Sequence, residues 1–416
     1  MRKTFILLLS SIVIFLGSCS VKTNDDLLVG TTPSEDHGVT PTSNAMSSPA
    51  TSEATHIDEN GLLSTPISTT TPDYWICWDW VWSGYEFGRV REIAESPSNI
   101  LWVLHDNGLV RLAPDGMKRV FDLREMLGCE ECMEIINGTL AISPDGNAWV
   151  GLSTGLLIID KTGEWKTIAT DVIVPQLEHP LEAYVLLTDK NGNIWVRIRN
   201  NLCSYDGKEW GCQPVKLRFE SDRIMSAVMG QDDQIWFGTY EGEIIQFDQN
   251  EFLVIDVPEK DFQNIRSLAF DHQTNTLWAV SSSVSKYQEV NKNYPSKILQ
   301  RTADGSLIFH ETSLFLWDGS ACDPPLFTSV AITPDGIVWV GMFFCHNLIY
   351  YDGVNWKGLD GTTLPYANSE ETEKTQENQC GLFGGYIVNV FVAEDGRLLF
   401  FDQGGDVLTN NIDFWK

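Results

Sequence analysis

The sequence predicts an all-β fold, and three observations support this fold class. Alternating apolar residues, a Pro-Asp-Gly turn and a tryptophan recur along the chain, most clearly in residues 141–168, AISPDGNAWVGLSTGLLIIDKTGEWKTI. Such turns between alternating apolar stretches predict short antiparallel strands. The repeat carries four of these strands, and a four-stranded unit cannot bury both of its faces alone. The sequence therefore predicts a β-propeller of four-stranded antiparallel blades.

The tryptophan of the second strand sets the expected number of blades. It stands at Trp102, Trp149, Trp195, Trp236, Trp278 and Trp339, and Leu399 replaces it in a last unit, residues 385–416. We therefore expect a seven-bladed β-propeller. The last unit is short in its fourth strand, so residues 74–82, YWICWDWVW, are expected to complete it. The alternative is that this segment forms a hydrophobic plug under the ring.

Two copies of the repeat point to a known family. The stretches SPDGNAWVGLSTGLLIID and GQDDQIWFGTYEGEIIQFD resemble the two-component regulator propeller repeat, and the resemblance covers about residues 90–416. In that family the propeller is often the extracytoplasmic sensor of a membrane histidine kinase. Stand-alone propellers of this type imply binding or scaffolding. The sequence has no kinase motif, so only the propeller and a binding role are carried over.

The amino terminus resembles a bacterial lipoprotein signal. Arg2 and Lys3 precede an apolar run, residues 5–16, that is too short to span a bilayer, and Leu-Gly-Ser then precedes Cys19. In the lipobox this cysteine carries the lipid chains; the alternative is an ordinary cleaved signal peptide. We expect a signal peptide (1–18), a lipidated, disordered Ser/Thr/Pro-rich tether (19–72) and the propeller (73–416). The protein would then be lipid-anchored in the bacterial cell envelope, on the extracytoplasmic side.

The chain is strongly acidic. Its 416 residues include 28 Lys and Arg against 57 Asp and Glu, a net charge of −29. Such a surface repels phosphate backbones, which argues against nucleic acid as a partner and favours cationic or neutral ligands. We expect a monomer without a cofactor, attached to the membrane only through the lipid on Cys19.

Long connections are expected on one face of the propeller. In a four-stranded blade, the turns between strands one and two and between three and four share a face, and all other connections share the opposite face. The first class is short; the turn at 189–193 resembles a calcium loop but lacks the bidentate Glu, so a structural turn is favoured. The long segments belong to the second class and are residues 124–134, 171–182, 281–296, 311–327 and 360–385. Recognition is therefore expected on this loop-rich face, near the central channel.

Candidate ligand-binding residues follow the expected second strands or lie on the long loops. They are His105, Asp106, Arg197, Arg199, Tyr240, Glu241, Tyr287 and His346. Each type also has a structural explanation: histidines are often ordinary loop residues, arginines pair with nearby carboxylates, and tyrosines anchor loops. No catalytic or metal-ligating residue is predicted, although the two histidines could converge across the channel.

Eight cysteines besides Cys19 predict disulfides in an exported protein. The turn at 206–209 places Cys203 opposite Cys212 on paired strands, within bridging distance. A redox or metal role for the CxxC motif at 129–132 is disfavoured, since no second CxxC and no thioredoxin-like context exist. The expected pairs are Cys203 with Cys212, Cys322 with Cys345, Cys77 with Cys380, and Cys129 with Cys132.

These features favour a binding or sensing module that recognises a glycan, a peptide or a protein through the loop-rich face. A scaffold for envelope protein complexes is one alternative. A lyase or hydrolase with a divalent metal is another, because some seven-bladed propellers of similar repeat style are lyases. Those enzymes rely on clustered histidines with acidic partners, whereas the seven histidines here are scattered. Propellers host many unrelated functions, so the function has to be argued from the site.

Overall fold

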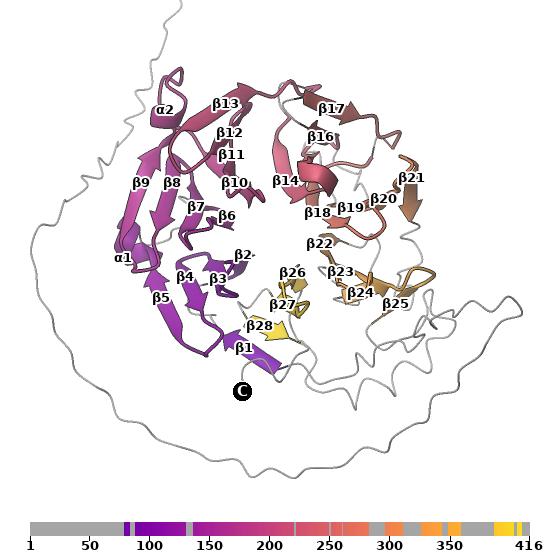
Figure 1. Ribbon diagram of the computed structural model, residues 1–416, viewed down its shortest axis with the longest axis horizontal. Helices are drawn as coiled ribbons and strands as arrows, with labels where there is room; N and C mark the ends of the chain where they lie inside the picture. Colours follow the sequence, from indigo (N-terminus) through magenta and orange to yellow (C-terminus); the bar gives the residue numbers. More distant parts are fainter. Residues whose placement is uncertain are drawn as a thin grey trace, which may run out of the picture. The chain divides into compact units, whose positions relative to one another are not determined.

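The structure is a computed structural model that describes residues 79–83, 88–129, 136–219, 222–248, 251–259, 261–282, 296–310, 326–342, 348–358, 387–402 and 406–409. Residues 70–416 form one compact unit. The described strands make seven four-stranded antiparallel sheets arranged in a ring (Figure 1), and we call the centre of this ring the channel. The prediction of an all-β propeller with four-stranded antiparallel blades is confirmed.

Six blades each contain four consecutive strands, numbered outward from the channel. Blade 1 contains β2 (Val90–Glu95), β3 (Leu101–His105), β4 (Gly108–Leu112) and β5 (Lys118–Asp122). Blade 2 contains β6 (Ile136–Ile142), β7 (Ala148–Leu152), β8 (Gly155–Ile159) and β9 (Trp165–Ala169). Blade 3 contains β10 (Ala183–Thr188), β11 (Ile194–Ile198), β12 (Asn201–Tyr205) and β13 (Trp210–Pro214).

The next three blades follow the same order. Blade 4 contains β14 (Ile224–Met229), β15 (Ile235–Thr239), β16 (Ile244–Asp248) and β17 (Glu251–Ile255). Blade 5 contains β18 (Ile265–Asp271), β19 (Thr276–Ser281), β20 (Ile298–Arg301) and β21 (Leu307–His310). Blade 6 contains β22 (Phe327–Ile332), β23 (Val338–Met342), β24 (Leu348–Tyr351) and β25 (Trp356–Gly358).

The remaining sheet is shared between the two ends of the propeller sequence. It contains β26 (Ile387–Val392), β27 (Leu398–Asp402), β28 (Asp406–Thr409) and, outermost, β1 (Asp79–Ser83). β1 pairs antiparallel with β28, with Asp79 opposite Thr409. The prediction that the segment before blade 1 completes the last sheet is therefore confirmed for its described part. The seven blades expected from the sequence correspond to the six continuous blades and this shared sheet.

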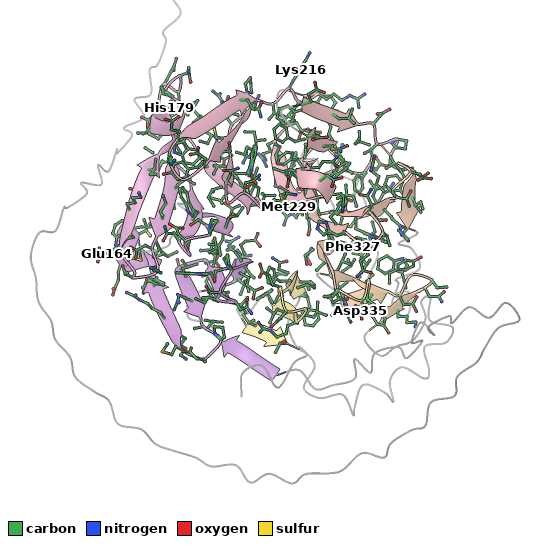
Figure 2. All side chains as sticks on the ribbon, in the orientation of Figure 1. Glu164, His179, Lys216, Met229, Phe327 and Asp335 are labelled. Carbon is green, nitrogen blue, oxygen red and sulfur yellow. A yellow bond between two sulfur atoms is a disulfide. The ribbon has the colours of Figure 1, made fainter. Side chains whose placement is uncertain are left out.

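Burial explains why the tryptophan recurs. The repeat residue lies on the second strand of every sheet and is at most 8% exposed in each: Trp102, Trp149, Trp195, Trp236, Trp278, Trp339 and Leu399. These rings also join neighbouring blades: Trp149 of blade 2 lies 5.4 Å from the Tyr205 ring and 6.1 Å from the Trp210 ring of blade 3. Figure 2 shows side chains filling the space between blades. The repeat thus supplies both the core of a blade and its contact with the next.

Each innermost strand has an irregularity in its pairing with the second strand. The register shifts in all seven described sheets, near the start of the inner strand except in β10, where it shifts between Val185 and Leu187. Because of the shift, Arg91 in β2 and Arg266 in β18 have no pairing partner on the second strand. A β-bulge leaves a residue unpaired and re-aims its side chain. Both residues lie on innermost strands of the ring (Figure 1).

Connections at one end of the blades are much longer than those at the other. The five predicted long segments all link blades or join a second strand to a third, so they leave the sheets at one end, which we call the loop-rich edge. Two of them begin with short helices, α1 (Leu123–Leu127) and α2 (Thr170–Ile173). The turns at the opposite end, the short-turn edge, have two to five residues. The strand order therefore agrees with the predicted asymmetry.

The short-turn edge is held by side-chain hydrogen bonds. Asp189 Oδ1 accepts from the backbone N–H groups of Asn191 and Asn193, both at 2.9 Å, and its Oδ2 accepts from Trp195 Nε1 at 2.8 Å. The carboxylate is thus saturated by the protein, as expected of a structural turn. In blade 4 the equivalent turn contains the one-turn helix η3 (Gln231–Asp233).

Several predictions concern residues outside the described part of the chain. They are the signal peptide, Cys19 and the tether, and the cysteines Cys77, Cys132, Cys322, Cys345 and Cys380. The Cys203–Cys212 disulfide is confirmed: it joins directly opposite residues of β12 and β13, whose Cα atoms are 4.1 Å apart. Cys129 is also disulfide-bonded.

Candidate functional site

Of the predicted site residues, the pair in blade 1 serves the blade itself. His105 is fully buried, and its Nδ1 lies 3.1 Å from the carbonyl oxygen of Gly88. Asp106 is 9% exposed, accepts from the Arg89 backbone N–H at 3.1 Å and forms an ion pair with Arg91. Both side chains therefore fasten the start of β2 to the end of β3, and their polar atoms are occupied by protein groups.

Arg197 and Arg199 do not share a strand. Arg197 is on β11 and is 3% exposed, with its guanidinium 3.9 Å above the Tyr184 ring and its Nη2 3.3 Å from Glu182 Oε1. Arg199 follows the end of β11, is exposed, and has a φ of 57°, which places it in a tight turn. Arg197 thus pairs with a carboxylate, as its structural explanation requires. This explanation applies only in part, because the partner Glu182 is 43% exposed and the ion pair is therefore only partly buried.

Tyr240 and Glu241 follow β15 at the loop-rich edge of blade 4. The Tyr240 backbone N–H donates to the Arg223 carbonyl at 2.9 Å, and the guanidinium of Arg223 lies 4.7 Å above the Tyr240 ring. The Glu241 N–H donates to Asp222 Oδ1 at 2.9 Å. These bonds fix the loop after β15 to the link that enters β14, so both predicted residues occupy a defined position beside the channel.

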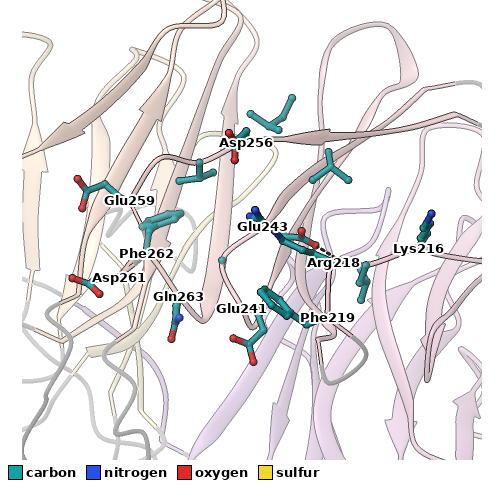
Figure 3. Close-up of a pocket in the computed structure, with 15 residues that line it drawn as sticks. Lys216, Arg218, Phe219, Glu241, Glu243, Asp256, Glu259, Asp261, Phe262 and Gln263 are labelled. Carbon is teal, nitrogen blue, oxygen red and sulfur yellow. Dashed lines mark hydrogen bonds between the residues drawn. The ribbon is translucent and has the colours of Figure 1, made fainter. Parts of the chain in front are cut away.

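A cavity opens beside these residues (Figure 3). Its volume is about 1080 Å³, and it lies between the links before and after blade 4. Figure 3 shows Phe219 and Arg218 on one side, Phe262 on the other, and Glu241 and Glu243 between them. Phe219 is 49% exposed, whereas Phe262 is buried. An open concave surface with an apolar floor and a few convergent polar groups is the usual form of a ligand site.

Carboxylates dominate the rim of the cavity. Five acidic side chains line it, against the two basic side chains Lys216 and Arg218. Glu243 is 7% exposed, and its Oε2 accepts from the Arg218 backbone N–H at 3.2 Å. Burial raises the pKa of Glu243, and the nearby Asp222 carboxylate raises it further. A buried carboxyl with a raised pKa in a cleft is typical of a functional site, although ion networks that only support structure show the same shift.

One glycine allows two segments of the cavity wall to lie close together. Gly242 has a φ of +95°, and a Cβ on this residue would lie 1.8 Å from the carbonyl oxygen of Phe262. A side chain there would therefore push the loop after β15 away from the link that leads to β18. The close approach of these two segments depends on this one residue.

The sequence analysis missed several residues of this region. Tyr184, Arg223 and Arg266 lie at the same edge, on or next to the innermost strands of blades 3, 4 and 5. One signal was available: charged or aromatic residues stand second in the inner strands at Arg91, Tyr184 and Arg266, where the other inner strands have Asn137, Met225, Thr328 and Val388. Phe219 and Glu243 had no such signal, because a link and a turn carry no periodicity.

Tyr287 and His346 lie outside the described residues, so their predicted roles stay predictions. Within the described ranges, no group of three or more His, Cys, Asp or Glu side chains is arranged to hold a metal ion. No helix in the described part of the chain combines the length and apolarity needed to cross a membrane.

The fold is shared with several solved proteins. The extracellular domain of a hybrid two-component system from B. thetaiotaomicron is 16% identical with a TM-score of 0.56; the match covers 80% of this chain and 40% of that one. A streptogramin B lyase is 14% identical with a TM-score of 0.54, covering 77% and 93%. YCF48, solved with a D1 peptide, is 12% identical with a TM-score of 0.51, covering 82% and 98%.

At these identities the comparisons show the propeller fold and nothing finer. No protein-family model matches the sequence, and no curated protein matches it either. One of the similar structures is the extracellular domain of a two-component system, to which the resemblance to the two-component regulator propeller repeat also points.

Proposed function

We propose that the protein is an extracytoplasmic binding or sensing module that recognises its ligand at the loop-rich edge of blades 3 to 5. The observation that carries this proposal is the cavity of about 1080 Å³ between the links around blade 4. It combines the exposed ring of Phe219 with convergent charged groups, and rigid blades hold the segments that form it. The similarity to a sensor's extracellular domain agrees with this role.

The cellular location is part of the proposal and depends on the amino-terminal sequence. Arg2, Lys3, the short apolar run and Cys19 support export and lipidation. Replacing Cys19 with Ser in a bacterial host should release the protein from the membrane fraction. Retention of the variant in that fraction would contradict lipid anchoring.

Catalysis receives less support than binding. The lyase alternative needs His105 and His346 to converge on a metal, but His105 is fully buried and bonded within blade 1, and His346 lies outside the described residues. The scaffold alternative uses the same edge and differs only in the size of the partner. We therefore propose binding without assigning a reaction.

A matched pair of surface variants tests the location of the site. The full chain is screened by calorimetry against neutral oligosaccharides and short peptides, and the tightest ligand is titrated into Phe219→Ala and Met117→Ala. Both side chains are exposed, at 49% and 64%, but Met117 lies at the short-turn edge. We expect Phe219→Ala to weaken binding at least tenfold, about 1.4 kcal/mol, and Met117→Ala to leave it unchanged. Equal binding by both variants, or loss only in Met117→Ala, would contradict the proposal.

A further inference from the structure

Three arginines and two tyrosines meet at the loop-rich end of the central channel. Arg197 lies 3.9 Å above the Tyr184 ring, and these residues are directly opposite in the β10–β11 pair. Arg223 lies 4.7 Å above the Tyr240 ring. The Tyr240 carbonyl accepts from the Asn264 N–H at 2.6 Å, two residues before Arg266. Blades 3, 4 and 5 thus each bring one arginine to this place.

The five side chains are also electrostatic neighbours. Tyr184 and Tyr240 both act on Arg266, and Arg223 acts on Arg197. Arg266 is left out of the β18–β19 pairing by the bulge and is exposed although it lies on an innermost strand. The bulge therefore re-aims its side chain relative to the regular strand. We call Tyr184, Arg197, Arg223, Tyr240 and Arg266 the channel-mouth cluster.

The described residues form one ion pair with this cluster, that of Arg197 with Glu182, and the Asp222 carboxylate accepts from the Arg223 backbone N–H at 2.7 Å. Among the described residues, the buried Nε of Arg197 has no hydrogen-bond acceptor. The Arg223 and Arg266 side chains have no ion pair with any described residue. Burial lowers the pKa of Arg197, and the charge of Arg223 lowers it further. Arginines gathered in this way favour the entry of an anion, which would relieve their mutual repulsion.

The local charge is opposite to that of the molecule. The chain has a net charge of −29, from which the sequence favours cationic or neutral ligands. A cationic cluster in an acidic protein is not explained by composition. The tyrosine rings cover one face of two guanidinium groups and so fix their direction, which is the preorganisation that oxyanion recognition requires.

We propose that the channel-mouth cluster binds an oxyanion, a carboxylate, sulfate or phosphate group carried by a small ligand. The proposal rests on the proposed function, because it assigns a chemical class to the ligand of the same edge. Arg266 is the exposed arginine that would contact the oxyanion. Arg197 lies below the surface, and its buried Nε has no acceptor among the described residues. The carboxylates around the neighbouring cavity would repel any anionic part that extends away from the cluster.

Calorimetry with the full chain at low salt tests this inference. The probes are trigalacturonate, its neutral counterpart galactotriose, inorganic sulfate and inorganic phosphate, which separate the three oxyanions from each other and from the sugar. We expect at least one oxyanion probe to bind while galactotriose does not. Arg266→Gln should weaken binding about tenfold, which is about 1.4 kcal/mol, and 500 mM NaCl should weaken it further.

Arg301→Gln is the matched control. Arg301 belongs to blade 5, as Arg266 does, and burial lowers the pKa of Arg301. It lies on β20 at the short-turn edge, over the Trp236 ring. The inference is overturned if no oxyanion probe binds the folded protein, or if Arg266→Gln binds as tightly as Arg301→Gln. If a neutral ligand binds the Arg266→Gln variant but not the Phe219→Ala variant, the oxyanion proposal is overturned, whereas the proposed binding function is supported.

Discussion

At the scale of single residues, His310 shows how the contact between blades constrains an ionisable group. Its ring stacks on Trp278 with centroids 5.0 Å apart, its Nδ1 accepts from Trp356 Nε1 at 3.1 Å, and its Nε2 donates to Gln300 Oε1 at 3.1 Å. Both ring nitrogens are thus used by the neutral form. Burial accordingly lowers the pKa of His310 to about 4. Between blades 5 and 6, folding favours the uncharged ring.

The first prediction concerns pH. A histidine whose pKa falls from 6.5 to about 4 on folding stabilises the protein fully above pH 6.5, and this contribution is lost as pH falls toward 4. Denaturant unfolding at pH 7.5 and 4.5 should show that the wild type loses about 2 kcal/mol more than His310→Gln.

Comparison with the variant is needed because Glu92 has the opposite effect. Burial raises the pKa of Glu92 to about 7, so its contribution falls as pH rises from 4.5 to 7. This term is the same in both proteins and cancels in the difference. Equal pH dependence of the wild type and His310→Gln would contradict the assigned protonation state.

At the scale of elements, the outer half of blade 3 is joined by a covalent bond. Cys203 and Cys212 are opposite each other on β12 and β13, and the next pair along the ladder is Ser204 opposite Gly211. β13 is the outermost strand of its sheet, so it has only one strand neighbour. The disulfide therefore holds the strand that is otherwise least fixed.

The second prediction follows from the length of the loop that this disulfide closes. Replacing both cysteines with Ala should lower the free energy of unfolding by about 2 to 3 kcal/mol, because nine residues of sequence separation are released in the unfolded chain. Hydrogen exchange of β13 should accelerate more than that of β10. Ser204→Ala, at the adjacent position, is the control and should change neither quantity. Unchanged exchange in β13 of the cysteine variant would show that the bond does not hold the strand.

Elements were predictable to the extent that they repeat. The tryptophan positions and turns located the blades, since every such residue is buried on a second strand. The Cys203–Cys212 pair followed from turn length alone. The bulges of the inner strands were not predictable, because a register shift leaves no mark in the apolar pattern. Arg266, which a bulge leaves out of the strand pairing, was missed for this reason.

At the scale of the whole molecule, one strand from the amino-terminal side closes the ring. β1 pairs with β28 across a separation of more than 300 residues, and the last sheet also packs against blade 1, where Val90 and Leu399 share a core cluster. Without β1, β28 would be an exposed edge. Strong strand formers in the segment made this closure predictable, whereas the net charge could not indicate the channel-mouth cluster, because a net value does not report how arginines gather locally.

The third prediction is that removing β1 weakens the whole propeller. Deletion of residues 74–83 should lower the midpoint of thermal unfolding by roughly 5 to 10 °C, since several kcal/mol of strand pairing are lost, and should promote self-association. Deletion of residues 22–69, within the predicted tether, is the control and should leave the midpoint unchanged. An unaltered midpoint after loss of β1 would show that closure contributes little.

The central claim is that recognition takes place at the loop-rich edge of blades 3 to 5. Hydrogen exchange of the full chain, with and without the tightest probe from the two screens, tests this most directly. We expect the probe to slow exchange in residues 215–219, 240–243 and 261–266 and to leave the turns at 113–117, 160–164 and 352–355 unchanged. Protection confined to those turns would contradict the account.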